Sequence, residues 1–278
     1  MTRVVVVGAA GRMGRTLIRC IATRAVPGIE LAGAVDLWDS PEISRDAGLV
    51  AGAGELGVAV TANLAAVAPQ ADAVIDFSAH HGTAGNASRC AEWGRPLVIG
   101  TTGLNADERG EVERAARRIP IVMSPNMSLG VNLLLLLVEQ AARALRDRGY
   151  DVEIIERHHR QKRDAPSGTA LALGEAVARG FAWPLDDVAV YGRHGMSPHA
   201  RPDRQIGFHA VRGGDLVGDH TVVMAGTGEC IEFSHRATSR DTFAVGALRA
   251  AQWVVGRPPG LYSMRDVLGL TPAPEGPP

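Results

Sequence analysis

The segment 153–170, EIIERHHRQKRDAPSGTA, concentrates side chains that can hold anions and exchange protons. Imidazole groups can exchange protons near neutral pH, so His158 or His159 can supply a proton to a bound molecule. The ammonium group of Lys162, with arginines on both sides, can stabilise negative charge that develops during a reaction. A histidine is more often structural than catalytic, and a run of charges is more often a solvated surface. The combination nevertheless indicates a site for an anionic small molecule.

The same segment ends in Pro-Ser-Gly-Thr, where a helix is predicted to begin near Gly168. Small residues at a helix N-terminus let an anion approach the N–H groups that have no partner within the helix. Ser167 or Thr169 can also cap this helix, whatever else binds there. We therefore expect the turn Ser167–Thr169 to hold a di- or polyanionic small molecule.

Two glycine-rich segments match dinucleotide-binding fingerprints. The segment 52–57, GAGELG, matches the strict spacing, whereas the segment 8–14, GAAGRMG, matches only a looser form. A pyrophosphate site needs a strand that feeds a tight turn and then a helix, so that backbone N–H groups and the helix dipole meet the phosphates. Only the first segment has this context, between a strand at Arg3–Val7 and a helix at Arg12–Thr23. We expect the second segment to be a flexible surface loop.

An acidic residue is expected about twenty residues after the glycine turn, where it accepts hydrogen bonds from the adenosine ribose. Asp36 occupies this place, although a solvated loop aspartate is the alternative interpretation. Its carboxylate suits the 2′-hydroxyl of NAD and repels the 2′-phosphate of NADP, and Leu37 and Trp38 follow it in place of a basic residue. Arg12 can still pair with that phosphate from the glycine turn. NADH is therefore the favoured cofactor, and use of NADPH stays open.

The elements that must position these residues follow a regular order in the first half of the chain. Short β-branched runs alternate with amphipathic stretches, which predicts a parallel sheet covered by helices on both faces. This is an α/β fold with a Rossmann-type doubly wound parallel sheet. The expected strands are Arg3–Val7, Leu31–Val35, Ala73–Phe77, Leu97–Gly100 and Ile121–Met123, and the expected helices are Arg12–Thr23, one through Cys90 and one from Ala106.

The second half has a different pattern and predicts a second, α+β domain. Three strand-like runs are joined by glycine-containing turns with no helix between them, so we expect them to pair antiparallel. We assign residues 1–126 plus 240–278 to a dinucleotide-binding domain and residues 127–239 to a substrate-binding and oligomerisation domain. The expected elements are helices at about Leu129–Arg146, from Gly168 and at about Thr242–Val255, and strands at Val152–Glu156, Ile206–Val211, Val217–Ala225 and Cys230–His235.

Composition narrows the classes of function. The net charge of -1 and the aromatic content of 4% give no general case for nucleic acid or an anionic membrane. Three widely spaced cysteines form no disulfide framework, and neither an HExxH motif nor a Cys/His cluster indicates a metal, so we expect a cytoplasmic protein without metal. No apolar run reaches the length of a membrane span. The Pro/Gly-rich tail from Arg257 is expected to be poorly ordered at its end.

The segment ERHHRQKRDAPSGTA resembles the signature of the 4-hydroxy-tetrahydrodipicolinate (dihydrodipicolinate) reductases of bacterial lysine biosynthesis. The resemblance extends along nearly the whole chain. It includes GAAGRMGR at the start, VIDFS at 74–78, VIGTTG at 98–103, PN at 125–126 and SHRATSRDTFAVGALRAA in the last third.

The resemblance implies a role for each matching residue. The first histidine, His158, would act as acid and base, assisted by Lys162, while His159 and the helix start Ser167, Gly168 and Thr169 would bind the substrate. The substrate would be a cyclic imine-type dicarboxylate that loses water and is reduced by hydride to tetrahydrodipicolinate. The enzyme would be a homotetramer assembled through the substrate domain. Cofactor contacts would come from Gly8, Ala9, Ala10, Gly11, Arg12, Met13, Asp36, Phe77, Gly100, Thr101, Thr102, Ser124, Pro125, Asn126 and Met127.

Two departures from the family pattern concern the cofactor. Leu37 replaces the basic residue that often follows the ribose-binding acid, which weakens a preference for NADPH. Ser124 and Met127 replace the more usual alanine and phenylalanine, which would adjust the nicotinamide pocket. Two other functions remain as alternatives: an aspartate- or homoserine-type dehydrogenase, against which the HHxxK spacing and the PSGTA helix start argue, and a regulator that senses NADH without turnover.

Overall fold

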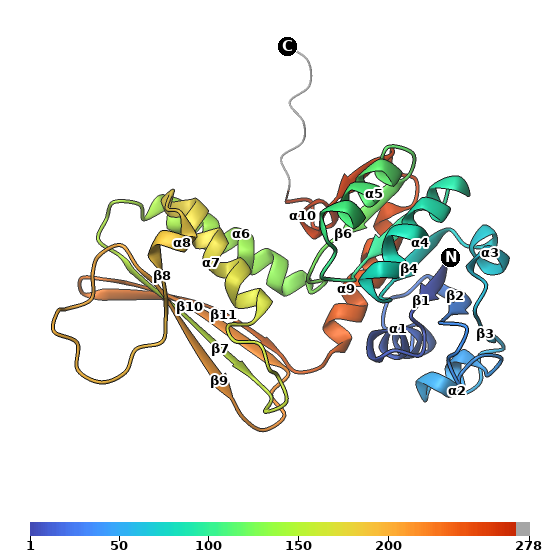
Figure 1. Cartoon of the computed structure of the whole chain (residues 1–278), viewed down its shortest axis with the longest axis horizontal. Coiled ribbons are helices and arrows are strands. Elements are labelled where there is room, and N and C mark those ends of the chain that lie inside the picture. Colours follow the sequence, from blue (N-terminus) through green and yellow to red (C-terminus); the bar gives the residue numbers. More distant parts are fainter. Residues whose placement is uncertain (271–278) are drawn as a thin grey trace, which may run out of the picture. The chain divides into compact units, whose positions relative to one another are not determined.

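The computed structural model describes residues 1–270, and the backbone divides into two compact units (Figure 1). The first unit contains Met1–Leu129 and the chain from Arg240 on, and the second contains Gly130–Ser239. Within the described residues, no helix is long and apolar enough to cross a membrane. The expected disorder at the end of the tail falls on residues 271–278, which lie outside the described part of the chain.

The first unit is built on a seven-stranded sheet in which every pairing is parallel. The strand order β12-β6-β5-β4-β1-β2-β3 places β1 near the centre, and Val4, Val5 and Val6 are completely buried, as expected for a strand covered on both faces. The predicted doubly wound fold is confirmed. The strands are β1 (Thr2–Val7), β2 (Ile29–Val35), β3 (Val60–Thr61), β4 (Ala73–Asp76), β5 (Leu97–Ile99), β6 (Pro120–Met123) and β12 (Gly260–Tyr262).

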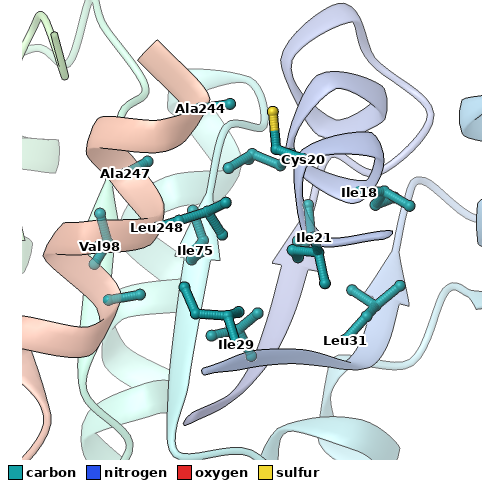
Figure 2. Packing of buried hydrophobic residues seen from close by; sticks show 14 of the residues in the cluster. Ile18, Cys20, Ile21, Ile29, Leu31, Ile75, Val98, Ala244, Ala247 and Leu248 are labelled. Atoms are coloured by element: carbon teal, nitrogen blue, oxygen red, sulfur yellow. The ribbon is translucent and has the colours of Figure 1, made fainter. Parts of the chain in front are cut away.

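Two hydrophobic clusters cover the two faces of this sheet. Val4 and Val6 point into a cluster with α1 and α9, whereas Val5 and Val7 point into a cluster with α4 and α5. In Figure 2, Ala247 and Leu248 of α9 lie near Ile75, so the last long helix completes a face that begins at the N-terminus. The helices are α1 (Arg12–Ala22), α2 (Ala47–Ala51), α3 (Leu64–Val67), η1 (Ala68–Gln70), α4 (His80–Glu92), α5 (Ala106–Ala116), α9 (Asp241–Val254) and α10 (Met264–Val267).

The second unit is a five-stranded mixed sheet with helices on one face (Figure 1). Val152 and Ile154 of the central strand are completely buried in a cluster with residues from α6 and α7. The strand order is β11-β10-β7-β9-β8. The elements are α6 (Leu129–Ala144), β7 (Asp151–His158), α7 (Gly168–Phe181), α8 (Leu185–Val188), β8 (Ala189–Tyr191), β9 (Ile206–Arg212), β10 (Gly218–Gly226) and β11 (Glu229–Ala237).

The expected antiparallel pairing of three consecutive strands is only partly right. Strands β10 and β11 form the predicted hairpin, but β9 pairs parallel with β7, and β7 separates β9 from β10. The short turn after β9 suggested a hairpin because neighbouring strands in sequence commonly pair. The earlier strand β7 is buried on the face that the helices cover. Its place in the centre of the sheet gives its backbone hydrogen-bond partners on both sides, in β9 and β10. Glu156 and His158 of β7 therefore lie between β9 and β10.

Several short elements were not predicted from the sequence, namely α2, α3, η1, α8, β8, β12 and α10. Each has five residues or fewer, too few for a periodic pattern. The second glycine motif follows α2, and Gly52 ends that helix in the left-handed region with φ 71°. The Asp46 carboxylate accepts hydrogen bonds from the N–H groups of Gly48, Leu49, Leu56 and Val58, which fixes both ends of this exposed loop.

Candidate functional site

The first glycine motif forms a tight turn between β1 and α1. Gly8 has φ 79°, and a Cβ there would lie 2.6 Å from the carbonyl oxygen of Phe77. A Cβ on Gly14 would lie 2.1 Å from the carbonyl oxygen of Gly8, so only glycine lets the helix start this close to the turn. The N-cap residue Gly11 makes no side-chain cap. The turn therefore presents backbone and a helix N-terminus, which fits a dinucleotide pyrophosphate.

Asp36 lies against this turn, directly after β2. Its Oδ2 accepts a hydrogen bond from Ala10 N at 2.6 Å, and its Oδ1 accepts one from Leu37 N at 2.8 Å. Each carboxylate oxygen can accept more than one hydrogen bond, so capacity remains for ribose hydroxyls. The acid is therefore held beside the glycine turn, as the dinucleotide fingerprint requires.

A buried carboxylate at the end of β4 connects the loops after β4 and β5, because Thr101 Oγ1 of the second loop donates to Asp76 Oδ1 at 3.4 Å. Asp76 is completely buried, and its Oδ1 accepts hydrogen bonds from Ser78 N at 2.8 Å and Ser78 Oγ at 2.6 Å, while its Oδ2 accepts one from Asn86 Nδ2 at 3.0 Å. The neighbouring Phe77 ring covers Gly100, where a Cβ would lie 2.2 Å from the ring. These contacts hold the two loops at the edge of the sheet where the predicted cofactor residues gather.

The turn after β6 is also internally bonded. Ser124 Oγ donates to the carbonyl oxygen of Asn126 at 2.8 Å, and the Asn126 side chain accepts a hydrogen bond from Ser128 N at 2.9 Å. The Met127 side chain is 2% exposed and packs in the core, whereas Pro125 is exposed. Buried Thr101 and exposed Thr102 follow β5. The structure thus brings the predicted cofactor residues to the carboxyl ends of parallel strands, after β1, β2, β4, β5 and β6.

In the second unit, His158 is the last residue of β7 and is 8% exposed. Its Nδ1 lies 2.5 Å from Oε2 of Glu156, which is two residues earlier on the same face of the strand and 1% exposed. Arg212 Nη1 donates to Glu156 Oε2 and Arg212 Nη2 donates to Glu156 Oε1, both at 2.7 Å. The catalytic candidate is therefore bonded to a carboxylate that a guanidinium grips on both oxygens.

The sheet register explains how these side chains meet. Arg212 on β9 is directly opposite His158, and His220 on β10 is directly opposite Glu156. Residues opposite one another on neighbouring strands point to the same face. The His158 and His220 rings meet edge to face with centroids 5.1 Å apart. Three strands thus contribute to one polar cluster beneath the helices.

The N-terminus of α7 is anchored in the same cluster. Ser167 N donates to Glu156 Oε1 at 3.0 Å, and Ser167 Oγ accepts from Ala170 N at 3.1 Å, which makes Ser167 the helix cap. The hydroxyl also bonds His220 Nε2 at 3.0 Å, and Ser167 is 2% exposed. Its side chain is therefore occupied by the protein, while Gly168 is exposed at the helix start.

Lys162 lies in the loop between β7 and α7, where its Nζ donates to Asp164 Oδ2 at 2.8 Å. This hydrogen bond holds the pKa of Asp164 below its usual value. Arg212 Nη2 also donates to the carbonyl oxygen of Asp164 at 2.6 Å, so the same guanidinium locates the loop. His159 is half-buried at the start of this loop.

The charges around His158 act in opposite directions. Burial lowers the pKa of His158, the hydrogen bond and charge of Glu156 raise it, and the charges of Lys162 and Arg212 lower it, with a net lowering. Burial raises the pKa of Glu156, but the bonds from Arg212 and His158 outweigh burial, so its pKa is lowered. Burial and the charge of His158 lower the pKa of His220 to about 4. Glu156 is thus the ionised partner of His158, beside a neutral His220.

The sequence patterns did not indicate Glu156, Arg212 and His220. They also did not indicate Gly218, where a Cβ would lie 3.0 Å from His158 Nε2. The spacing of Glu156 and His158 could have shown that both share one face of a strand. Arg212, Gly218 and His220 lie more than fifty residues further on, and only the pairing of β9 and β10 with β7 brings them to the cluster.

The comparisons with known proteins agree with this geometry. The N-terminal model of dihydrodipicolinate reductase matches residues 2–127, and the C-terminal model of the same family matches residues 130–268. The chain is 54% identical over 270 residues to a 4-hydroxy-tetrahydrodipicolinate reductase of Anaeromyxobacter dehalogenans, covering 97% of this chain and 98% of that one. It is 53% identical over 268 residues to the enzyme of that name in Thiobacillus denitrificans, covering 96% and 98%.

A solved structure supports the fold. The dipicolinate-bound dihydrodipicolinate reductase of Paenisporosarcina sp. TG-14 matches with a TM-score of 0.74 at 23% identity, covering 96% of this chain and 99% of that one. Both family models and the curated relatives together span both units of the chain. The chain belongs to the dihydrodipicolinate reductase family.

Proposed function

We propose that this chain reduces 4-hydroxy-tetrahydrodipicolinate to tetrahydrodipicolinate with NADH or NADPH, a step of lysine and diaminopimelate biosynthesis. The observation that carries the proposal is the 54% identity to a relative of that name over 97% of the chain. The geometry supports it, because one unit offers a dinucleotide turn and the other offers a proton donor beside a helix N-terminus.

The substrate carboxylates bind at the start of α7 and among the cations of the preceding loop. Gly168 is exposed at the first turn of the helix, whose N–H groups and dipole favour an anion. Thr169 and His159 flank this turn, and Lys162 adds positive charge. Ser167 contributes through the helix geometry that its capping hydroxyl fixes. Holding both carboxylates fixes the orientation of the carbon that is reduced.

The turn Gly8–Met13 would hold the pyrophosphate of the nucleotide, and Asp36 would accept hydrogen bonds from its ribose. The bound nucleotide would supply the hydride. Asp36 favours NADH because its carboxylate accepts bonds from a 2′-hydroxyl and repels a 2′-phosphate, while Arg12, exposed at the turn, leaves NADPH usable. The loops around Phe77, Gly100–Thr102 and Ser124–Met127 surround the nicotinamide end.

His158 supplies the proton that completes the reduction. Water leaves the hydroxylated substrate, hydride reduces the conjugated imine, and the resulting negative charge is neutralised by a proton from His158 on the adjacent carbon. Lys162 stabilises that charge before the proton arrives. Glu156 remains ionised throughout, because Arg212 holds both its oxygens.

The direct test is oxidation of NADH or NADPH with freshly generated synthase product as substrate. We expect His158→Gln and Lys162→Met to lower kcat by about 100-fold or more while NADH binding stays nearly unchanged. His194→Gln is the matched control, because His194 is an exposed histidine of the same unit. Absence of turnover in the wild type would refute the proposed reaction, and nearly full turnover in either variant would refute the role of that residue.

We also propose that the enzyme is a cytoplasmic homotetramer assembled through the second unit. The sheet face opposite α6 and α7 carries a hollow of about 370 Å³, whose lining includes Ile155, Val223 and Arg157. Half-exposed apolar and charged groups side by side on one sheet face suit a contact between copies of the chain. Light scattering should give four times the mass of the 29.2 kDa chain, and a monomer would refute the assembly.

A further inference from the structure

We propose that Glu156, gripped by Arg212, is a positioning residue that keeps a proton on Nδ1 of His158 and makes Nε2 the atom that exchanges protons with the substrate. This inference rests on the proposed role of His158. It assigns a task to two residues, on β7 and β9, that do not themselves touch the reacting atoms.

Glu156 and His158 form a buried, hydrogen-bonded pair. Glu156 Oε2 lies 2.5 Å from His158 Nδ1, and both side chains are buried. An ionised carboxylate only accepts hydrogen bonds, so the imidazole nitrogen that faces it must carry the proton. In neutral His158, the unprotonated nitrogen is then Nε2. In charged His158, Nε2 carries the transferable proton and Nδ1 remains bonded to Glu156.

Arg212 keeps Glu156 ionised and in place. Its two terminal nitrogens each donate to one oxygen of Glu156 at 2.7 Å, and one of them also donates to the carbonyl oxygen of Asp164 at 2.6 Å. Ser167 N donates to the same carboxylate at 3.0 Å. The carboxylate of Glu156 therefore sets the position of the proton donor and of the helix start, and Arg212 connects it to the loop that carries Lys162.

The other side of the His158 imidazole ring faces strand β10. A Cβ on Gly218 would lie 3.0 Å from His158 Nε2 and 3.3 Å from His158 Cδ2. The strand β10 thus passes His158 at a glycine, and no side chain from that position crowds Nε2. The ring is bonded to Glu156 on its Nδ1 side, and on its Nε2 side the glycine on β10 leaves room that a side chain would take.

Charged groups on the neighbouring elements set the direction in which each substitution should shift the pKa of His158. Glu156 on β7 raises the pKa of His158, whereas Lys162 in the loop and Arg212 on β9 lower it, and His220 on β10 is neutral above its own pKa of about 4. Glu156→Gln should therefore shift the His158 limb of the kcat/KM profile to lower pH. Arg212→Met should shift the same limb to higher pH. General destabilisation of the fold does not produce two opposite shifts.

The experiment combines these pH profiles with nitrogen NMR of the full enzyme labelled on histidine. In the wild type we expect neutral His158 to carry its proton on Nδ1. The NMR signal of His158 is assigned as the one that disappears in His158→Gln. In Glu156→Gln the amide oxygen should turn to the donors of Arg212 and its NH2 group to the ring, which forces the Nε2–H form. We expect kcat to fall about 100-fold, with a much smaller change in the KM for substrate.

Glu153→Gln is the matched control. Glu153 lies on the same strand and also bonds a histidine and arginines, namely His209, Arg193 and Arg201, but on the opposite face of the sheet. We expect it to leave the His158 form, the pH profile and kcat unchanged. An Nδ1–H form in Glu156→Gln together with kcat within twofold of the wild type would overturn the inference.

The Arg212→Met profile provides a second criterion if Glu156→Gln does not fold. A shift of the His158 limb to higher pH supports the inference, and an unchanged limb overturns it. Failure of the proposed reaction would appear as absence of turnover in the wild type, and failure of the proposed role of His158 as full turnover in His158→Gln. Failure of this inference alone leaves His158→Gln inactive and Glu156→Gln active.

Discussion

The two units solve the problem of placing a ligand in different ways. The dinucleotide turn of the first unit is made of backbone, with glycines at positions where any Cβ would collide with a carbonyl oxygen. The proton site of the second unit is made of polar side chains from three strands, and its charged members Glu156 and Arg212 hold one another. A backbone site is sensitive to added volume, whereas a side-chain site is sensitive to lost charge. The following changes test this contrast.

Gly14→Ala should have the largest effect. The new methyl group would lie 2.1 Å from the carbonyl oxygen of Gly8, so the turn or the helix must move. We expect a loss of about 3 kcal/mol in the free energy of unfolding and at least a tenfold weaker binding of NADH. Calorimetry and fluorescence titration measure the two quantities. Gly85→Ala is the control, because a Cβ there meets nothing within 4 Å, and a stable, binding-competent Gly14→Ala would contradict the expectation.

Acid should weaken the second unit through its carboxylates. Burial raises the pKa of Glu153, but bonds from Arg193, His209 and Arg201 outweigh burial and lower it to about 2 from 4.5. A lowered folded-state pKa stabilises the protein above pH 4.5, and that contribution disappears as pH falls toward 2. With solvent screening it amounts to about 2 kcal/mol.

Thermal melts of the wild type and Glu153→Gln test this contribution. The melting temperatures should differ most at neutral pH and converge as pH falls below 4.5, the unperturbed pKa of the carboxyl. Hydrogen exchange should show earlier loss of protection in β7 and β9 than in β1. A pH-independent difference between the two proteins would contradict the assignment.

Gly218→Ala should have an intermediate effect. Its methyl group would lie 3.0 Å from His158 Nε2, so the ring must shift by a few tenths of an ångström. We expect kcat to fall about tenfold, equivalent to about 1.4 kcal/mol, with little change in the melting temperature. Gly213→Ala on the neighbouring turn meets nothing within 4 Å and should behave as wild type. Equal kcat values for the two variants would show that Nε2 does not face the substrate.

Leu37→Arg should have the smallest effect. Leu37 is 63% exposed and follows Asp36 directly, so an arginine there can pair with the 2′-phosphate of NADPH. An exposed ion pair contributes about 1 kcal/mol, which corresponds to roughly a fivefold gain in kcat/KM for NADPH relative to NADH. Leu37→Gln is the uncharged control. No change in the ratio would indicate that the ribose lies elsewhere.

The same contrast explains how much could be predicted from the sequence. The glycine turn and its flanking strand and helix are contiguous, so their pattern predicted both the fold and the turn between β1 and α1. Asp36 follows at a spacing set by one crossover. The signature segment predicted His158, Lys162 and the helix start at Gly168, because these residues lie within one loop and its two flanking elements.

The partners of His158 could not be predicted, because they depend on strand pairing. Arg212 reaches Glu156 only since β9 runs parallel to β7, and the sequence analysis wrongly paired β9 with its neighbour in the chain. Ser167 was expected to touch the substrate, but its hydroxyl caps α7 and bonds His220. Side-chain hydrogen bonds across a sheet produce no recognisable pattern in the sequence. A glycine turn between a strand and a helix does.

The return of α9 to the first unit has a consequence for synthesis of the protein. Ala244, Ala247 and Leu248 are completely buried against the sheet that begins at β1 (Figure 2). A ribosome therefore releases the whole of the second unit before it makes the helix that closes this face. Until residue 254 emerges, the early strands expose an apolar surface, which makes the nascent chain a client for chaperones and makes a fragment ending at residue 129 prone to aggregate.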